Sequence, residues 1–517
     1  MVIFVKVFTG LPVINFSSLR MAATLLLLGL AAASESRPRV WTDGSWRDAT
    51  TNQSLLYHGI NFVEKGPPYY PNITDADLDA MEEMGLNAVR LGVMLGGLLP
   101  TSLEPDVAYL TTIKSIIARL WARRIAVIID LHQDVLSPVV CGEGAPAWMI
   151  NTSTLGLKLP FPRPVSFNTT KHHVPDPVNG GWLPPLDGEA CATQGWLAPM
   201  GWSEWYMSDA CGKAFAQLYS GRGMLGAAVK VYWTTVASEL RDVDGILAYE
   251  LLNEPWVGDH VGDPDLLLVG GAAERGPIGE YMRAMHAVVR AVDPRTAVLY
   301  SPAQINDDAM RRVGFERGFL ASEPMAFHVY CIEGTDSVGP ATPGVQALCH
   351  VNDGAQVDVR RADLKRLGTG GFVTEFGGVA DVDTGRAEVR HVASLLEGTF
   401  PLSWTFWAGV PSSDAYRREL ARPYPRAVAG SLVEYSANAT SGVLSVRFEP
   451  APSSTMLAVG NSTEIVLSKY WYPRGWSVLL MPKGCCLVEQ APFGIRVWPI
   501  SSASPATIEM TIAPSVQ

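Results

Sequence analysis

The chain has 517 residues, of which 48% are hydrophobic and 18% are charged, and its formal net charge is −11. This balance excludes a disordered or collagen-like chain, and an acidic chain without basic runs is not expected to bind nucleic acid. No stretch beyond the N-terminus reaches the roughly 20 apolar residues that a transmembrane helix needs. We therefore expect a large soluble globular protein.

Residues 1–33 predict a signal peptide. Arg20 precedes an apolar run that ends in Ala31-Ala32-Ala33 before Ser34, which is the small-residue pattern of a cleavage site. A membrane anchor is disfavoured because the run from Met21 is only about 13 residues long. Met21 is also an alternative start of translation, and the sequence leaves that choice open.

Sequons for N-glycosylation agree with passage through the secretory pathway. The chain contains seven of them, the first inside the predicted signal peptide: Asn15, Asn52, Asn72, Asn151, Asn168, Asn438 and Asn461. We expect a protein that is secreted, that lies in a vesicular or lysosome-like lumen, or that is held at a membrane. The sequence does not choose among these compartments.

Short β-rich runs alternate with helical patterns through most of the chain. The runs are Tyr57–Asn61, Asn87–Gly92, Ile125–His132, Ile246–Asn253, Ala297–Pro302, Met325–Tyr330, Gly371–Gly377 and Leu402–Trp407. Helical spacing of apolar residues predicts helices between them, including Asp75–Met84, Thr111–Arg124, Ile278–Val292 and Arg386–Leu396. Eight such units predict an α/β fold, a (β/α)8 TIM barrel over residues 34–424. A doubly wound open sheet of the dinucleotide-binding kind is disfavoured, because the first strand lacks a Gly-rich phosphate loop.

The connection after the third strand is unusually long. Residues 141–210 contain five of the 15 tryptophans and many prolines. Long connections in compact domains are usually functional, and at this end of a barrel one would form a wall of the active site. A self-packed decoration held by disulfides is the alternative.

Residues 425–517 show a different pattern. Short β-like runs with turn signals lie at Val443–Phe448, Glu464–Leu467, Trp476–Leu480 and Gly494–Trp498. They predict a small C-terminal β-sandwich. Such a module either packs on the barrel or binds carbohydrate or lipid.

The seven cysteines suit an oxidising compartment, where their odd number leaves at least one without an intramolecular partner. Cys331 and Cys349 flank one short loop, so we favour this pair first. Cys141 with Cys191 or Cys211 would close the long insertion. No Cys or His spacing resembles a zinc site, so we predict no metal and no cofactor.

Polar residues at the carboxyl ends of barrel strands are where catalytic groups are expected. Glu254 follows the fourth strand and Glu375 ends the seventh. Two glutamates that face each other across a barrel mouth provide the acid and the carboxylate that glycoside hydrolysis requires, and a gap of about 5–5.5 Å would make the reaction retaining. Each glutamate alone would be weak evidence.

The ordered set of strand-end residues resembles glycoside hydrolase family 5, whose members are retaining (β/α)8 barrels. This set is Arg90, His132, Asn253-Glu254, His328-Val329-Tyr330, Glu375 and Trp407. Four further segments resemble the endoglycoceramidases within that family: Asn61 to Lys65, Asp130 to Asp134, Cys141 to Gly144 and Arg422 to Pro425. The resemblance spans roughly residues 40–510.

The resemblance implies a role for each residue. Glu375 would be the nucleophile and Glu254 the acid and base, which is typically worth about 10²–10⁴-fold in rate. Arg90 and Tyr330 would bond Glu375, and His328 would contact Glu254. The remaining residues would contact the sugars: Asn253 at the 2-hydroxyl, Trp407 as an apolar floor, and Lys65, His132 and Asp134 at other hydroxyls.

The expected substrate is therefore a glycosphingolipid, cut between oligosaccharide and ceramide, with transient contact to a membrane or micelle surface and no obligate protein partner. One alternative is a glucosylceramide or steryl β-glucosidase, or another family 5 β-glucan hydrolase. A catalytically silent glycolipid-binding protein is disfavoured by the presence of both glutamates. Leu95 stands where relatives often carry a tryptophan, so a wall aromatic is missing there. We hypothesise that Leu95–Leu99, Trp148, Trp182 and Trp256 form an apolar path for the lipid tails.

Overall fold

The computed structural model describes residues 37–40, 44–155, 174–176, 181–183, 202–331, 343–451, 462–500 and 506–515. All described residues belong to one compact unit, residues 37–517. The predicted signal peptide and the sequons at Asn15, Asn168 and Asn461 lie outside the described residues. Among the described helices, none has both the length and the apolar character to cross a membrane.

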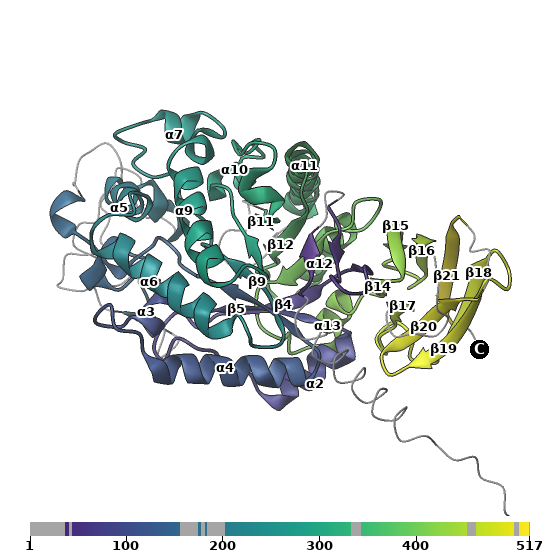
Figure 1. Ribbon diagram of the computed structural model, residues 1–517. Helices are drawn as coiled ribbons and strands as arrows, with labels where there is room; N and C mark the ends of the chain where they lie inside the picture. Colours follow the sequence, from purple (N-terminus) through teal and green to yellow (C-terminus); the bar gives the residue numbers. More distant parts are fainter. Residues whose placement is uncertain are drawn as a thin grey trace, which may run out of the picture. The chain divides into compact units, whose positions relative to one another are not determined.

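Eight parallel strands form the predicted barrel (Figure 1). They are β4 (His58–Phe62), β5 (Ala88–Gly92), β6 (Ala126–Asp130), β9 (Ile246–Glu250), β10 (Ala297–Leu299), β11 (Met325–Val329), β12 (Gly371–Phe376) and β13 (Ser403–Phe406). Their order is β10-β9-β6-β5-β4-β13-β12-β11, and a bridge between Tyr300 and Met325 closes the ring. Each strand overlaps a predicted run, so the barrel is confirmed.

Helices surround these strands and bury their apolar faces against them (Figure 1). The long ones are α2 (Asp75–Met84), α4 (Val107–Ala122), α5 (Asp209–Tyr219), α6 (Gly223–Leu240), α9 (Pro277–Val292), α11 (Pro343–Leu367) and α12 (Asp383–Leu395). Shorter ones are α3 (Leu95–Leu98), α7 (Asp265–Leu268), α8 (Ala272–Arg275), α10 (Gln304–Asp308) and α13 (Asp414–Leu420). Helix α2 has the predicted limits because Thr74 and Asp77 form a capping box at its start, and Gly85, with φ of 77°, ends it in the left-handed conformation.

The predicted β-sandwich is present and consists of two antiparallel sheets. One sheet has the order β1-β2-β3-β14-β17-β20-β19 and the other β15-β16-β21-β18. The C-terminal strands are β14 (Tyr424–Val428), β15 (Gly430–Ala437), β16 (Leu444–Pro450), β17 (Thr463–Val466), β18 (Trp476–Met481), β19 (Cys486–Ala491), β20 (Gly494–Pro499) and β21 (Ile508–Pro514). Three short strands upstream of the barrel complete the first sheet: β1 (Arg39–Val40), β2 (Trp46–Arg47) and β3 (Ser54–Leu55). Strands from before and after the barrel therefore share one sheet, while the last strand, β21, lies in the other sheet.

The sandwich packs against the amino ends of the barrel strands. His58, the first residue of β4, stacks between Trp404 and Tyr424 with ring centroids 4.3 and 3.7 Å away. The Tyr424 hydroxyl donates to the carbonyl of Gly85 at 3.0 Å. The carboxyl ends of the strands are thus at the opposite end of the barrel, where a substrate site is expected.

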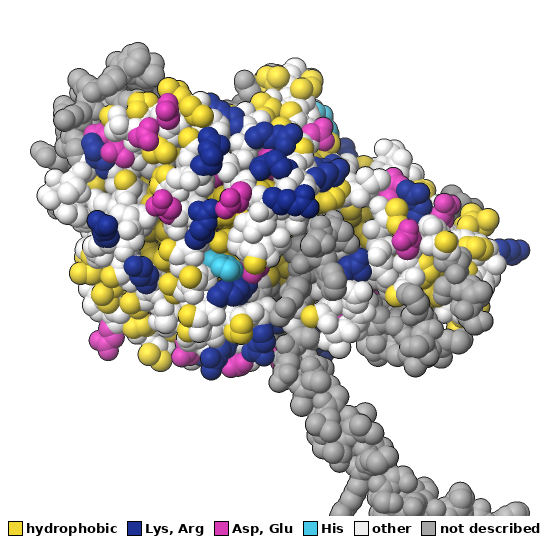
Figure 2. All heavy atoms as spheres, turned by 45° about the horizontal axis from the view of Figure 1, so that its top comes forward, with side chains coloured by type: hydrophobic (Ala, Val, Ile, Leu, Met, Phe, Trp, Pro, Cys, Tyr) yellow, Lys and Arg dark blue, Asp and Glu magenta, His cyan; other side chains and the backbone are white. Residues whose placement is uncertain are grey.

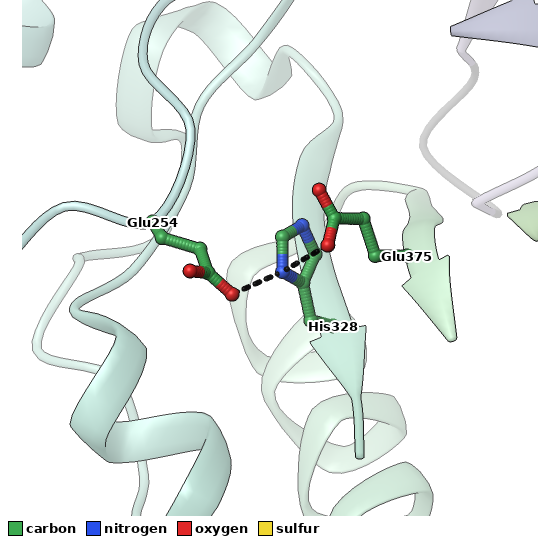
Figure 3. Close-up of side chains that lie close together, drawn as sticks. All are labelled: Glu254, His328 and Glu375. Atoms are coloured by element: carbon green, nitrogen blue, oxygen red, sulfur yellow. Dashed lines mark hydrogen bonds and ion pairs between the residues drawn. The ribbon is translucent and has the colours of Figure 1, made fainter. Parts of the chain in front are cut away.

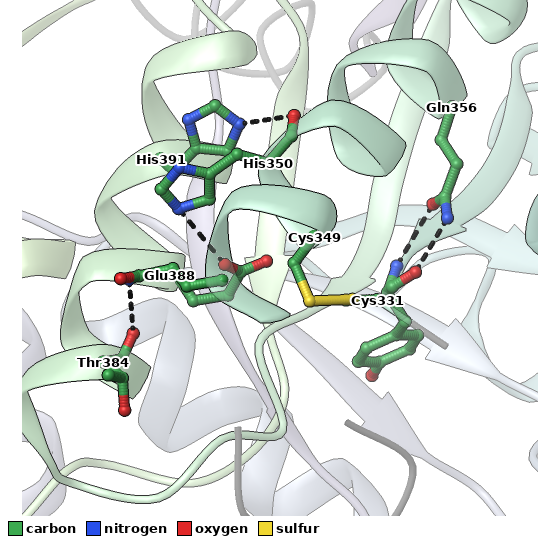
Figure 4. The surroundings of a disulfide bond; sticks show 9 residues. Cys331, Cys349, His350, Gln356, Thr384, Glu388 and His391 are labelled. Atoms are coloured by element: carbon green, nitrogen blue, oxygen red, sulfur yellow. Dashed lines mark hydrogen bonds and ion pairs between the residues drawn. A yellow bond between two sulfur atoms is a disulfide. The ribbon is translucent and has the colours of Figure 1, made fainter. Parts of the chain in front are cut away.

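The pairing of Cys331 with Cys349 is confirmed: a disulfide joins the end of β11 to helix α11 (Figure 4). Cys211 is a buried free thiol, so the structure does not join it to Cys141. Cys191 lies outside the described residues, and its pairing stays a prediction.

The described part of the long insertion contains a small hairpin, β7 (Val174–Asp176) with β8 (Gly181–Leu183), and short 3-10 helices such as Trp202–Met207. Residues 156–173, 177–180 and 184–201 lie outside the described part. Both readings of this insertion, as a wall of the site or as a self-packed decoration, stay open.

The face drawn in Figure 2 carries basic and acidic side chains interspersed with apolar ones. The expectation that the protein does not bind nucleic acid, drawn from the net charge, stays a prediction.

Candidate active site

The structure brings the ten predicted site residues together at the carboxyl ends of the strands. Arg90 lies in β5, His328 in β11 and Glu375 in β12, while the others follow the ends of β4, β6, β9, β11 and β13. They form two groups of direct contacts, one around Glu375 and one around Asp134. Asp130 joins the groups, because its carboxylate contacts both Arg90 (3.1 Å) and His132 (2.7 Å).

Glu254 and Glu375 point toward one another with His328 beside them (Figure 3). The Nδ1 atom of His328 lies 2.8 Å from Glu254 Oε1 and 3.6 Å from Glu375 Oε2. One carboxylate oxygen of each glutamate and the His328 nitrogen all lie within 4.8 Å of one another. This close approach matches the spacing of about 5–5.5 Å between carboxyl groups in retaining glycosidases, where no water fits between them.

Within the described residues, the same three side chains form a group whose donor atoms could hold a metal ion. Protein partners already serve these atoms: His328 bonds Glu254, and Tyr330 donates to Glu375 Oε2 at 2.8 Å. These polar atoms therefore have hydrogen-bond partners within the protein, and the absence of a metal stays a prediction.

Arg90 is fully buried and fixes the nucleophile candidate. Its Nη1 atom donates to Glu375 Oε1 at 2.6 Å, and its Nε atom donates to Glu250 at 2.6 Å. Burial would lower the pKa of Arg90, but the charges of Asp130, Glu250 and Glu375 outweigh it and raise the pKa well above the usual value. Two amide oxygens complete the set of acceptors, those of Asn61 and Asn253.

Burial and neighbouring charges shift the pKa values of Glu254, the candidate acid, and of His328 beside it. Burial raises the pKa of Glu254, and the charge of Glu375 raises it further. The hydrogen bond from His328 lowers this pKa, but by less than burial raises it. For His328 burial alone would lower the pKa, but the charges of both glutamates outweigh it and raise the pKa to about 9. The raised pKa of Glu254 favours its protonated form, as a general acid requires.

The Glu254 backbone has φ of 39°, a region that residues other than glycine rarely adopt. The Gln133 side chain donates to the carbonyl oxygens of Asn253 and Glu254 at 2.7 and 3.0 Å and holds this turn in place. The unusual conformation aims the carboxylate at the barrel mouth.

The second group surrounds Asp134. Its carboxylate accepts from Lys65 and lies 3.2 Å from His132 Nε2. The His132 ring stacks on Trp407 at 5.3 Å between centroids, and Lys65 Nζ lies 5.2 Å from the centre of the same ring. Lys65 also lies 3.1 Å from Glu143. A half-buried indole beside a fixed cation and carboxylates is a suitable surface for a sugar ring and its hydroxyls.

These contacts set the charges of the second group. Burial would lower the pKa of His132, but Asp130 and Asp134 outweigh it and raise the pKa to about 9. Burial alone would raise the pKa of Asp134, yet Lys65 and His132 hold it well below the usual range. Burial raises the pKa of Glu143 to about 7.

The sequence did not identify several groups of the site. Asp130 and Glu250 are the last residues of β6 and β9, two and three residues before the ends of the predicted runs. Asp130 and Glu143 lie in segments used only for the resemblance. Asp308 ends α10, which follows β10, and burial together with the charge of Glu254 raises its pKa to about 8. The sequence carries one signal that could have identified Asp308. Asp307 and Asp308 form a pair of acidic residues after the fifth strand, which was the one strand without a predicted site residue.

The hypothesis of an apolar lipid path is wrong for most of its residues. Leu95, Leu98, Leu99 and Trp256 are buried, at most 4% exposed, and pack in the barrel core. Trp148 is half-buried and donates to the carbonyl of Pro100 at 3.0 Å, and the side chain of Trp182 lies outside the described residues. The apolar loop residues are buried because they close the ends of the barrel, where solvent would otherwise reach the core.

The family model described as cellulase (glycosyl hydrolase family 5) matches residues 48–161 and 213–413, and the glycoside hydrolase family 5 C-terminal domain matches residues 422–507. The chain belongs to glycoside hydrolase family 5. Within this family, an endoglycoceramidase from Cyanea nozakii is 27% identical to this hydrolase, over 83% of this chain and 84% of its own. Endoglycoceramidase I from Rhodococcus hoagii (strain 103S) is 27% identical over 82% and 79%.

Among solved structures, endo-glycoceramidase II from Rhodococcus sp. in complex with ganglioside GM3 superposes on this family 5 hydrolase with a TM-score of 0.69. It is 21% identical and covers 90% of this chain and 98% of its own. This likeness shows the same fold.

Proposed function

We propose that this hydrolase is a retaining endo-β-glycosidase that cleaves the bond between the oligosaccharide and the ceramide of glycosphingolipids. The observation that carries the reaction type is the close pair of Glu254 and Glu375, each with its own hydrogen-bond partners. The substrate class is supported by the relatives at 27% identity, which are endoglycoceramidases.

The chemistry divides between the two carboxyls. Glu375, held in place by hydrogen bonds from Arg90 and Tyr330, attacks the anomeric carbon while Glu254 gives its proton to the glycosidic oxygen, and ceramide leaves. Glu254, now a carboxylate, takes a proton from water, and the resulting attack releases the sugar from Glu375. His328 holds the Glu254 carboxylate in place during both steps.

The remaining predicted residues bind the sugar. Asn253 is bonded to Arg90 and to the Gln133 carbonyl, so its amide is fixed for the 2-hydroxyl of the reacting ring. Trp407 forms the floor, and Lys65, His132 and Asp134 offer charged donors and acceptors along its edge.

Product analysis tests the proposal. A ganglioside, lactosylceramide and glucosylceramide are each incubated with the wild type, with Glu375→Gln, and with Glu434→Gln as a control on the sandwich. We expect intact oligosaccharide and free ceramide from the wild type and the control only. Glucose from glucosylceramide alone would indicate a monoglycosidase, and release from no lipid would leave a β-glucan hydrolase or a binding protein.

We also propose that the protein passes through the secretory pathway and touches a lipid surface when it acts. The exposure of Asn52, Asn72, Asn151 and Asn438 supports glycosylation of these sequons. Digestion of the natural protein with an N-glycosidase is expected to lower its mass, and an unchanged mass would contradict the proposal.

A further inference from the structure

Among the described strands, none pairs with the backbone of Tyr330. The last residue of β11 that pairs with β12 is Val329, opposite Phe376. Tyr330 follows directly, so its N–H and C=O fall beyond the ladder while its hydroxyl must reach Glu375. Backbone polar groups that are buried without a partner are costly, so another element has to supply one.

Gln356 of helix α11 supplies both hydrogen bonds. Its Oε1 atom accepts from the Tyr330 N–H at 3.2 Å, and its amide nitrogen donates to the Tyr330 carbonyl at 2.7 Å. The Gln356 side chain is 1% exposed, and these two bonds imitate the pairing of one more strand residue.

The disulfide fixes the next residue to the same helix face. Cys331 follows Tyr330, and its partner Cys349 lies seven residues before Gln356. Seven residues are close to two helical turns, so Cys349 and Gln356 face the same side of α11. Figure 4 shows the disulfide and the Gln356 amide side by side at the end of β11.

One helical turn further on, Arg360 reaches the other half of the site. It is 1% exposed, and its Nε atom lies 3.1 Å from Asp307 Oδ1. The other oxygen of Asp307 accepts from the backbone N–H of His328 at 3.4 Å. A single helix thus contacts the backbone of Tyr330 directly and the backbone of His328 through Asp307, and the side chains of these two residues bond Glu375 and Glu254.

We propose that α11 positions the reacting carboxyls, with Gln356 and the Cys331–Cys349 disulfide holding Tyr330 against Glu375, and Arg360 holding His328 against Glu254 through Asp307. The inference rests on the roles proposed above for the two glutamates. Gln356 is a positioning residue, since it acts through Tyr330 and not on the substrate.

Two substitutions at Gln356 and one control test the inference. Gln356→Met keeps the volume and removes both hydrogen bonds, and misplacement of the nucleophile is expected to lower kcat by about 10- to 100-fold with little change in KM. In Gln356→Glu the protonated side chain again offers one donor and one acceptor, so kcat relative to wild type is expected to recover as the pH falls. Gln346→Met is the control, because Gln346 lies on the same helix but donates to Thr384 instead.

The assay uses a chromogenic aryl β-lactoside, which reports on the two carboxyls without ceramide. A wild type that cleaves this substrate but no glycosphingolipid would refute the proposed substrate and leave the test of α11 intact. Wild-type kcat in Gln356→Met, or an equal loss in Gln346→Met, would overturn the inference. Replacement of Cys331 and Cys349 by serine is expected to cause a smaller loss than Gln356→Met.

A crystal structure of Gln356→Met provides a readout without activity. We expect the Tyr330 hydroxyl to move away from Glu375, and an unchanged contact of 2.8 Å would contradict the inference. This measurement decides the case even if the aryl lactoside is not turned over.

Discussion

Two buried arginines, one at each end of the barrel, serve different purposes. Arg90 contacts Glu375 at the carboxyl ends of the strands, and Arg422 contacts Glu397 at the joint with the sandwich, both at 2.6 Å. Glu397 is closed off, since its second oxygen accepts from the Ala437 N–H. Glu375 instead faces another carboxyl and a tyrosine hydroxyl. A buried glutamate that is paired with arginine can therefore be either catalytic or structural. The feature that separates the two here is the second carboxyl close to Glu375.

The largest expected effect is on activity, in Arg90→Lys. Lysine keeps the charge but cannot bond Glu250, Glu375 and Asn253 at once, because it lacks the planar fork of arginine. We expect kcat/KM to fall by about 100-fold or more as Glu375 loses its fixed position. Steady-state kinetics on the aryl lactoside measure this loss. An activity near that of the wild type would mean that Arg90, like Arg422, has only a structural role.

The matched change, Arg422→Lys, is expected to act on stability alone. Arg422 donates twice to Glu397 and once to the Ala437 carbonyl, and the loss of part of this set costs about 1.5–3 kcal/mol of unfolding free energy. Denaturant unfolding measures the loss, while kcat of the folded enzyme is expected to stay at the wild-type value. A large drop in kcat would mean that the joint and the site are coupled.

A buried pair of carboxyls, Asp353 and Glu388, sharpens the comparison, because no arginine among the described residues forms an ion pair with either of them. Asp353 of α11 is fully buried, and burial together with neighbouring Glu388 raises its pKa to about 10, from 3.8. Above about pH 4 the folded state keeps a proton on Asp353 that the unfolded chain releases. The free energy of unfolding is therefore expected to fall as the pH rises from about 4 toward 10. In Asp353→Asn the melting temperature is expected to depend less on pH and to exceed that of the wild type at pH 8. Parallel melting curves from pH 5 to pH 9 test this, and equal slopes would contradict it.

The smallest effect is expected at the solvent edge of the joint. Lys469 and Glu83 form an ion pair at 2.6 Å, but their side chains are 59% and 44% exposed. Exposed pairs contribute about 0–1 kcal/mol, so Lys469→Ala is expected to leave the unfolding midpoint almost unchanged. A loss as large as that of Arg422→Lys would show that surface charge, and not the buried contacts, holds the sandwich to the barrel.

The barrel and the polar strand ends were predictable because both follow local rules. Buried parallel strands are continuous apolar runs, and the residue that ends each run must lie at the mouth. The helix limits were sharpest where caps are encoded, as at Thr74 and Gly85.

The parts that the sequence did not predict depend on contacts between distant segments. The two-residue strands β1, β2 and β3 exist only because β14 offers them an edge. The alternating exposure of β19 and β21 gave no continuous apolar signal. Asp130 and Glu250 end their strands, and only the register of β5, β6 and β9 against one another brings Arg90 to them. The burial of Leu95 and Trp256 likewise depends on which loops close the barrel.

The sheet that joins strands from before and after the barrel has a consequence for synthesis. Strand β3 pairs with β14, and more than 360 residues separate Leu55 from Ala427. A ribosome therefore delivers the whole barrel before β3 can find its neighbour, and until then the edge of β3 is open to other chains. A fragment that stops before Tyr424 would carry this exposed edge permanently, so the catalytic barrel is expected to aggregate when it is expressed alone.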